Sequence, residues 1–358
     1  MRFIFKTDYE QDIRIVKHGG QAFWYGLLGL FLLAAPWILS EYVLAQLVFV
    51  LIYATVGLGL MLLAGFTGQF SIGHAAFLGV GAYTQAVLTN AGWPFPLALA
   101  CSGGLSAIVG VIIGVPALRV KGIYLGIATL AFGFIVEEAM ARWESVTGGN
   151  AGMHVKSPAM FGWTLESSVE FYFLCLVVVV LCTLAILNLL RSPTGRAFVA
   201  IRDSEISAQS MGIHLARYKT TSFALSAALA GLGGALYAHK IKFLSPEQFN
   251  IVQSIDLLLM VVVGGLGSVH GVFLGAIFLI TMPQLIAMAK DYLPASVGQS
   301  PGLQLVVYGV VLVAFVMFEP HGLYGRWLKM RTYLQLFPFY RAGMFRRQKS
   351  FQKSDRLK

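Results

Sequence analysis

Polar side chains that are costly to place in lipid follow an apolar stretch in the segment GFTGQFSIGHAAFLGVGAYT, residues 65–84. Its hydrogen-bonding side chains are Gln69, Ser71 and His74. The glycines that precede the next apolar run are Gly65, Gly68 and Gly73. Glycines at this density favour an interrupted helix, whose freed backbone groups need partners inside the protein or from water. The polar side chains either supply those partners, plug a structural turn, or line a path for a polar solute.

A second glycine-rich stretch later in the chain resembles the first. It contains Gly264, Gly265 and Gly267, and it leads into HGVFLG at 270–275, which echoes HAAFLG at 74–79. Internal repeats are common in transporters, and the solute site often lies where the repeats meet. His270 is therefore a further candidate for the translocation path, although four matching positions out of six also arise by chance in a chain of this composition.

Enzymatic chemistry has little support in the sequence. The patterns GxxxxGK[ST], HExxH and CxxC are absent. His74 and His270 have no acid or cysteine at metal-ligand spacing, so we expect no metal or cofactor in this chain and favour packing over catalysis for a lone histidine. The acids Glu137, Glu138 and Asp256 fall near span ends. They leave an ion-coupled secondary transporter as a weaker alternative.

The elements that must position these groups are membrane spans. The chain has 358 residues, of which 57% are hydrophobic and only 12% are charged, with a mean hydropathy of +0.74. This composition predicts an all-α polytopic membrane protein. We expect about ten transmembrane helices, at residues 23–40, 42–64, 72–90, 95–115, 122–139, 169–190, 219–238, 254–270, 271–290 and 301–318.

The distribution of basic residues predicts the orientation of these spans. With both termini in the cytoplasm, the charged inside segments are 1–22, 116–121, 191–219 and 319–358. They hold 4, 2, 5 and 10 Lys or Arg residues, which is 21 of the 26 in the chain. This bias agrees with the positive-inside rule. The predicted organisation is a cytoplasmic segment 1–22, a transmembrane domain 23–318 and a basic cytoplasmic tail 319–358.

The inside loop 191–219 has the features of a site where a soluble partner transmits motion. Asp203 to Ser210 favours a short helix with an acidic start, and Gly212 can end it. A new apolar run begins near Thr220. A short helix between two spans forms a cytoplasmic knob, although an ordinary amphipathic connector has the same pattern.

The stretch EISAQSMGI resembles the coupling loop of bacterial ABC importer permeases, in which Glu, Ala and Gly recur. Here the matching residues are Glu205, Ala208 and Gly212, with Ser207 where Ala is usual. Further blocks occur in the same order across residues 42–326: GQFSIGHAAFLGVGAYT, RVKGIYLGIATLAFG, TGGNAG, SPTGRAFVAIRDSEISAQSMGI, the segment 226–238, VVVGGLGSVHGVFLGA and FEPHGLYG. Together they resemble the branched-chain amino acid importer permease family of the LivM type.

This resemblance implies an ABC importer permease architecture in a bacterial inner membrane, working by alternating access. It implies a second homologous permease, two cytoplasmic ATPase subunits that bind ATP and magnesium, and a periplasmic substrate-binding protein. The ATPases would dock around Glu205 to Gly212, and the outside loops 140–168 and 239–253 would face the binding protein. Partners other than these and the lipid bilayer, such as nucleic acid, are not implied. The same superfamily includes permeases for urea, amides and aromatic carboxylates, so the substrate stays open.

Overall fold

The computed structural model describes residues 19–117, 120, 122–160, 163–164, 167–290, 302–318 and 322–336. Residues 1–18 of the predicted N-terminal segment and residues 337–358 of the basic tail lie outside the described residues. The described chain is almost entirely helical, as the composition predicts.

Every predicted span contains a long helix. These helices are α2 (Gly19–Ile38), α3 (Glu41–Leu60), α4 (His74–Asn90), α5 (Phe95–Ala117), α6 (Ile123–Arg142), α8 (Ser168–Arg191), α11 (Leu215–Ile241), α12 (Ile251–Gly264), α13 (Val269–Lys290) and α15 (Leu303–Phe318). Within the described residues, eight helical stretches are long and apolar enough to cross a bilayer. The helices α4 and α15 are shorter, with 17 and 16 residues. The chain is therefore a polytopic helical membrane protein.

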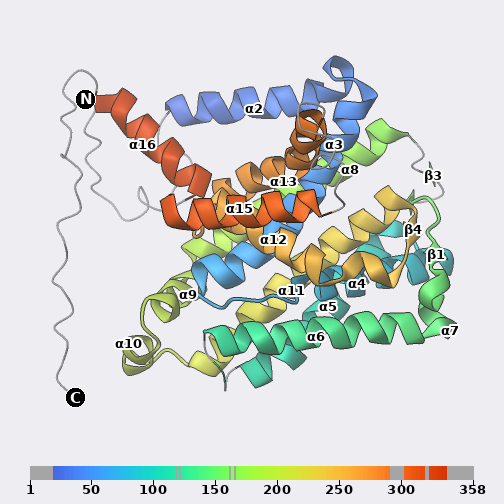
Figure 1. Ribbon diagram of the computed structural model, residues 1–358, viewed down its shortest axis with the longest axis horizontal. Coiled ribbons are helices and arrows are strands. Elements are labelled where there is room, and N and C mark those ends of the chain that lie inside the picture. Colours follow the sequence, from blue (N-terminus) through green and yellow to red (C-terminus); the bar gives the residue numbers. More distant parts are fainter. Residues whose placement is uncertain are drawn as a thin grey trace.

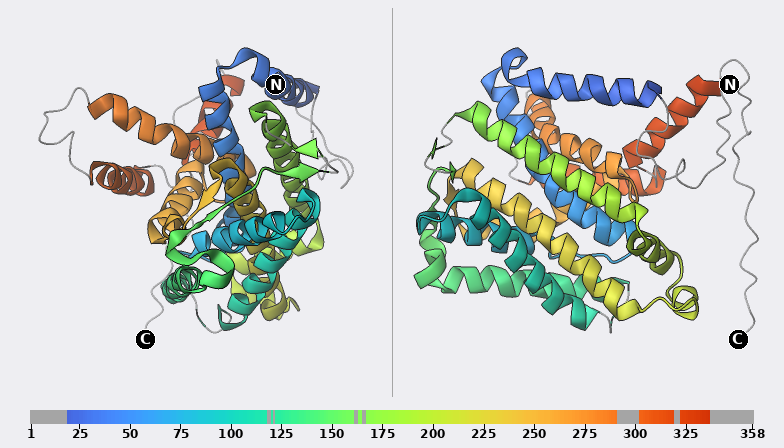
Figure 2. Two further views of the ribbon diagram at one scale, coloured as in Figure 1. Left: turned by 90° about the vertical axis from the view of Figure 1, so that its right-hand side faces the viewer. Right: turned by 180° about the vertical axis from the view of Figure 1, so that it is seen from behind.

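Shorter elements lie at the two ends of the helical bundle (Figure 1). At one end are α9 (Pro193–Asp203), α10 (Glu205–Ser210) and α16 (Gly322–Leu336). At the other end are α7 (Glu144–Thr147), the turns η2 (Gly149–Ala151) and η3 (Pro246–Phe249), and the strands β1 (Met153–His154), β2 (Ala159–Met160), β3 (Trp163–Thr164) and β4 (Phe243–Leu244). We refer to these as the α9–α10 end and the strand end. Figure 2 shows the long helices running between them.

Helix α11 is the centre of the bundle, and it packs against α3, α4 and α5. Glycines make these contacts close enough for backbone to meet backbone. A Cβ at Gly59 of α3 would lie 2.5 Å from the carbonyl oxygen of Ser226 in α11, and a Cβ at Gly81 of α4 would clash with the backbone of Gly231. The glycine content of the sequence is thus used largely for helix packing.

The junction between the last two long helices before α15 differs from the prediction. The spans 254–270 and 271–290 were expected to meet at residue 270, whereas α12 ends at Gly264 and α13 begins at Val269. The reason is backbone conformation, because Gly265 and Gly267 have φ values of 116° and 82°, which a helix does not accommodate. Hydropathy alone does not detect this break, since the flanking residues are equally apolar.

The two predicted outside loops join each other at the strand end. Strand β1 of the first loop pairs antiparallel with β4 of the second, with Met153 opposite Leu244. Asn90, at the end of α4, donates from Nδ2 to the carbonyl oxygen of His154 at 2.8 Å. These contacts tie the loops 140–168 and 239–253 into one surface.

Candidate functional site

An extended stretch of chain interrupts the helices between α3 and α4. Helix α3 continues into the π-helix η1 (Met61–Phe66), and residues 67–73 are then non-helical up to the start of α4 at His74. The stretch starts beside Arg202, at the α9–α10 end, and reaches Thr129, two turns inside α6. Figure 1 draws it as a thin trace that follows α3, and its residues alternate between buried Thr67, Gln69 and Ser71 and exposed Gly68 and Phe70. Non-helical backbone at this depth is tolerated only inside the protein or beside a cavity.

The freed backbone groups of this stretch are satisfied by other elements. The N–H of Gln69 donates to the carbonyl oxygen of Leu63 at 3.0 Å. The N–H of Ile72 donates to Oγ1 of Thr129 at 3.0 Å, and the N–H of Ala75 to Oγ of Ser254 at 3.1 Å. The side chains of Gln69, Ser71 and His74 do not take this role, so that alternative from the sequence is wrong.

Those three side chains are instead buried with unused polar atoms. Ser71 and His74 are 0% exposed and Gln69 is 5% exposed. Both amide atoms of Gln69, the hydroxyl of Ser71 and Nδ1 of His74 have no hydrogen-bond partner in the described part of the chain. The other ring nitrogen of His74 lies 3.5 Å from Oγ of Ser226. Buried polar atoms without partners are rare and costly, so these three neighbouring side chains are candidates for contact with water or a polar solute.

The two glycine-rich turns contact each other at the α9–α10 end. A Cβ at Gly65 would lie 2.7 Å from the backbone nitrogen of Gly267, and that N–H points at Sδ of Met61, 3.1 Å away. Arg202 joins them, because its Nη1 donates to the carbonyl oxygen of Gly65 at 3.1 Å and lies 3.5 Å from the position of a Cβ at Gly267. A Cβ at Gly68 would also lie 3.0 Å from Cγ of Arg202.

His270 lies in a different environment from His74. The hydroxyl of Tyr25 in α2 is 2.8 Å from Nε2 of His270, and the ring of Tyr324 in α16 stacks on the imidazole with centroids 5.5 Å apart. The ring of His74 contacts Phe77 and Ser226 instead. His270 therefore lies where α2 and α16 pack on α13, and its contacts are not with Gln69, Ser71 or His74.

The segment α9–α10 is built by conventional caps. Ser192 caps α9, with Pro193 as its first residue, and Ser204 caps α10 by accepting from the N–H of Ser207 at 3.3 Å. Gly212 follows α10 with a φ of 82°, and nothing lies near its Cβ position, so glycine is needed there for conformation rather than for space. The short helix and its glycine end agree with the sequence prediction.

A buried ion pair anchors α10 to the bundle. Nζ of Lys219, in α11, lies 2.6 Å from Oε1 of Glu205, and the Lys219 side chain is only 6% exposed. Ala208 is buried on the same side. Ile206 and Met211 face outward and are 81% and 83% exposed. Two large apolar side chains are therefore left uncovered beside an anchored helix.

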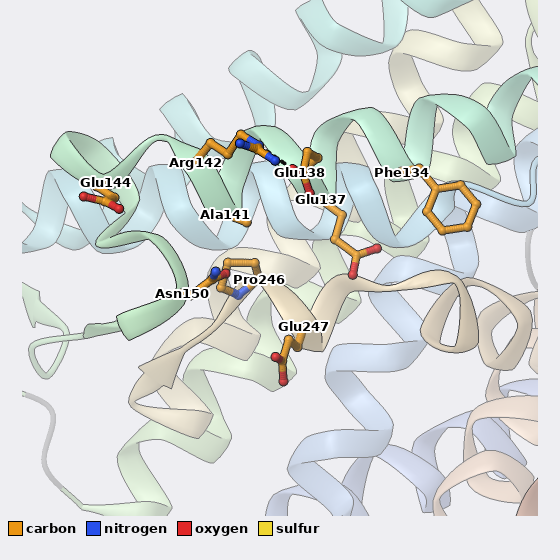
Figure 3. A pocket seen from close by; sticks show the side chains of 9 residues that line it. All are labelled: Phe134, Glu137, Glu138, Ala141, Arg142, Glu144, Asn150, Pro246 and Glu247. Atoms are coloured by element: carbon orange, nitrogen blue, oxygen red, sulfur yellow. Dashed lines mark hydrogen bonds and ion pairs between the residues drawn. The ribbon is translucent and has the colours of Figure 1, made fainter.

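An open cavity of about 730 Å³ lies at the strand end between α6, α7, η2 and η3 (Figure 3). Glu137 extends from α6 toward the segment that carries Glu247, while Glu138 forms an ion pair with Arg142. Phe134 borders this cavity and also a small gap of about 10 Å³ next to Ile72 and Ser254. Glu137 and Glu138, two of the acids expected near span ends, thus line an open cavity at the strand end, and Phe134 separates it from the small gap beside Ile72.

Four residues that hold this region together were missed from the sequence. Arg202 and Lys219 were counted only as positive charges, although both are structural partners of predicted residues. The position of Arg202 directly before the predicted coupling helix was the available signal. Thr129 and Ser254 gave none, because isolated hydroxyls are common in apolar helices.

Comparison with known proteins decides the family. The family described as branched-chain amino acid transport system / permease component matches residues 42–316. The chain belongs to this family. It is 33% identical over 324 residues to the high-affinity branched-chain amino acid transport system permease protein LivM of Escherichia coli K12, covering 83% of this chain and 74% of that protein.

Other relatives show the breadth of the similarity. The LivM protein of Salmonella typhimurium is 34% identical over 298 residues, covering 76% of this chain and 68% of that protein. The autoinducer 2 import system permease protein LsrC of Enterobacter sp. is 26% identical over 261 residues, covering 69% of this chain and 70% of that protein. No solved structure is significantly similar to this chain.

Proposed function

We propose that this permease is one of two membrane-spanning subunits of an ATP-driven importer for branched-chain amino acids or related small amino or carboxylic acids. The observation that carries the proposal is α10. It is a short helix held to the bundle by the Glu205–Lys219 ion pair, with Ile206 and Met211 exposed beside it. A rigid knob with an uncovered apolar surface suits a soluble subunit that pushes on the bundle.

The proposed topology has ten spans with both termini in the cytoplasm of a bacterium. It counts α4 and α15 as spans beside the eight longer stretches. Support comes from the basic residues of 191–219, which gather at the α9–α10 end, whereas the paired loops gather at the opposite end (Figure 1). The α9–α10 end is then cytoplasmic and the strand end faces the periplasm.

The proposed assembly follows from this orientation. Two ATPase subunits, which bind ATP and magnesium, dock at α10. A homologous permease completes the path through the membrane, and a periplasmic binding protein delivers the solute to the strand end. The open cavity lined by Glu137 and Glu247 lies on that surface (Figure 3).

The proposed path passes the interrupted segment. Gln69, Ser71 and His74 present unused hydrogen-bonding atoms there, which is what a solute needs when it leaves water. Arg202 connects this segment to α10, since it lies three positions before Glu205, the first residue of that helix, and donates to the Gly65 carbonyl oxygen. A movement of α10 would therefore be transmitted to the interrupted segment through the side chain of Arg202. Alternating access requires such a connection between the ATPase docking site and the solute path.

The experiment that tests the proposal combines copurification with transport. The tagged chain is expected to copurify with a second permease and ATPase subunits, and the complex in proteoliposomes is expected to take up leucine in an ATP-dependent manner. Glu205→Lys is expected to reduce uptake at least about tenfold. The new lysine replaces the partner of buried Lys219 with a second positive charge, so the two side chains repel each other. The matched control is the exchange Glu205→Lys with Lys219→Glu, which restores an ion pair and part of the uptake.

Two outcomes would overturn the proposal. Uptake by the purified chain alone under an ion gradient would place it among secondary transporters. ATP-dependent uptake at the normal rate by Glu205→Lys, at equal expression, would remove α10 from the coupling mechanism.

A further inference from the structure

A second cavity, lined by none of the residues of the interrupted segment, is an open pocket on the side of the bundle. It has a volume of about 340 Å³ and opens between α3, α11, α12 and α13. One face of α3 borders it, through Tyr42, Gln46, Phe49 and Tyr53, which are spaced by four, three and four residues. Tyr53 and Tyr237 are both buried and pack edge to face, with ring centroids 6.3 Å apart. The size is in the range of small-molecule sites, roughly 300–1,000 Å³.

The charge of this cavity is one-sided. Asp256, in the second turn of α12, is its single acid, and no Lys, Arg or His is among the residues that line it. Asp256 is half-buried and has no hydrogen bond or ion pair in the described part of the chain. A carboxylate inside a membrane protein is costly unless a cation or donor accompanies it. Asp256 therefore needs a positively charged partner, and the residues that line the cavity do not provide one.

The remaining lining separates a polar side from an apolar side. The amides of Gln46, Gln253 and Gln284 provide neutral donors and acceptors, and Nε2 of Gln253 donates to the hydroxyl of Tyr53 at 3.1 Å. Phe49 and Ile280 provide apolar surface. Lys240 lies outside the lining, with Nζ 5.6 Å from the centroid of the Phe49 ring.

We infer that this cavity is a binding site for a neutral amino acid with an apolar side chain, whose ammonium group pairs with Asp256. The glutamine amides donate to the ligand carboxylate, and Phe49 and Ile280 cover its hydrocarbon part. This site rests on the proposed function, because it assigns a place on the chain to the solute that the importer carries. It adds a negatively charged partner for the ammonium group of the solute. Gln69, Ser71 and His74 carry no negative charge and do not provide one.

The first arm of the test measures transport. Proteoliposomes that contain the complete transporter are assayed for ATP-dependent uptake of L-leucine, with the original chain, with Asp256→Asn and with Glu170→Gln. Glu170 is the matched control, as an acid in the first turn of α8 at the same end of the bundle. We expect Asp256→Asn to lower uptake about tenfold or more, because a charged contact is lost. Glu170→Gln is expected to stay within about twofold.

The second arm reports binding directly. Ile280→Cys is made in a background with Cys101, Cys175 and Cys182 replaced by Ala, and its reaction with a methanethiosulfonate reagent is timed. L-leucine is expected to slow this reaction, and 4-methylpentanoate, which lacks the ammonium group, is expected to leave it unchanged. Asp256→Asn should abolish the protection by leucine.

The outcomes separate this inference from the proposed function. Absence of leucine uptake by the original transporter would contradict the proposed function. Normal uptake by Asp256→Asn, or protection of the cysteine by 4-methylpentanoate as strong as by leucine, would overturn the site and leave the proposed function standing. The second result would indicate an apolar occupant such as a lipid chain.

Discussion

Residues 65–73 and residues 264–268 are both glycine-rich connections that lead into a helix with the same spacing of His, Phe, Leu and Gly. The first becomes a long extended stretch that carries His74 to a fully buried position inside the bundle. The second is a short turn, and His270 stays at the bundle surface against Tyr25 and Tyr324. In both places the shared pattern lies at the start of a helix. The longer connection before α4 places that helix start inside the bundle, whereas the short turn before α13 leaves its start at the surface.

The glycines of the two connections also serve different purposes. Gly73 is needed for space, because a Cβ there would clash with the carbonyl oxygen of Thr129 in α6. Gly267 is needed for conformation, since its φ is 82° and its nearest neighbour is the flexible end of Arg202, 3.5 Å from a Cβ position. Gly73 is thus required by the packing of its neighbours, whereas Gly267 is required by its own backbone conformation.

The largest effect that would test this comparison is expected from Gly73→Ala. The added methyl meets helix backbone, which cannot move aside, so we expect a loss of about 3 kcal/mol of stability. Gly267→Ala is the matched control and should cost about 1 kcal/mol, the strain of a left-handed alanine. Thermal unfolding of both purified variants in detergent measures the difference. Equal losses of stability in the two variants would show that the two glycines are not needed for different reasons.

A smaller effect is expected from Arg202→Gln, which tests whether the two connections respond together to α10. The variant loses the charged donor to the Gly65 carbonyl, a contact worth about 1.5–3 kcal/mol. We expect ATP hydrolysis by the complete transporter to continue while leucine uptake falls about tenfold. Arg217→Gln, at an exposed position in the first turn of α11, is the control and should transport normally. Parallel loss of hydrolysis and uptake would argue against a role in transmission.

The smallest effect is expected from Ser71→Ala, and its sign is informative. Removing a fully buried hydroxyl without a partner should raise stability by up to about 1 kcal/mol, while uptake of leucine falls if the path passes this point. Ser254→Ala is the opposite case, because Oγ of Ser254 accepts from the N–H of Ala75, and it should lower stability by about 1 kcal/mol. Higher stability with unchanged uptake would make Ser71 a packing residue only.

The sequence predicted the helices well because apolar length is a strong signal in membrane proteins. It also predicted α10 and its glycine end, since caps and positive φ values have local signatures. It could not show that Thr129, Arg202 and Ser254 hold the interrupted segment, because these contacts join residues between 57 and 179 positions apart. For the same reason it placed Asp256 merely near a span end, without the cavity that surrounds it.

The extended segment has a consequence for how this protein enters its membrane. Its backbone partners are synthesised late, the last of them 179 residues after Ala75. When α3 and α4 first leave the ribosome, the N–H groups of Ile72 and Ala75 therefore have no native acceptor, and lipid offers none. These native hydrogen bonds can form only after α6 and the start of α12 have been synthesised, which is residue 254 of 358.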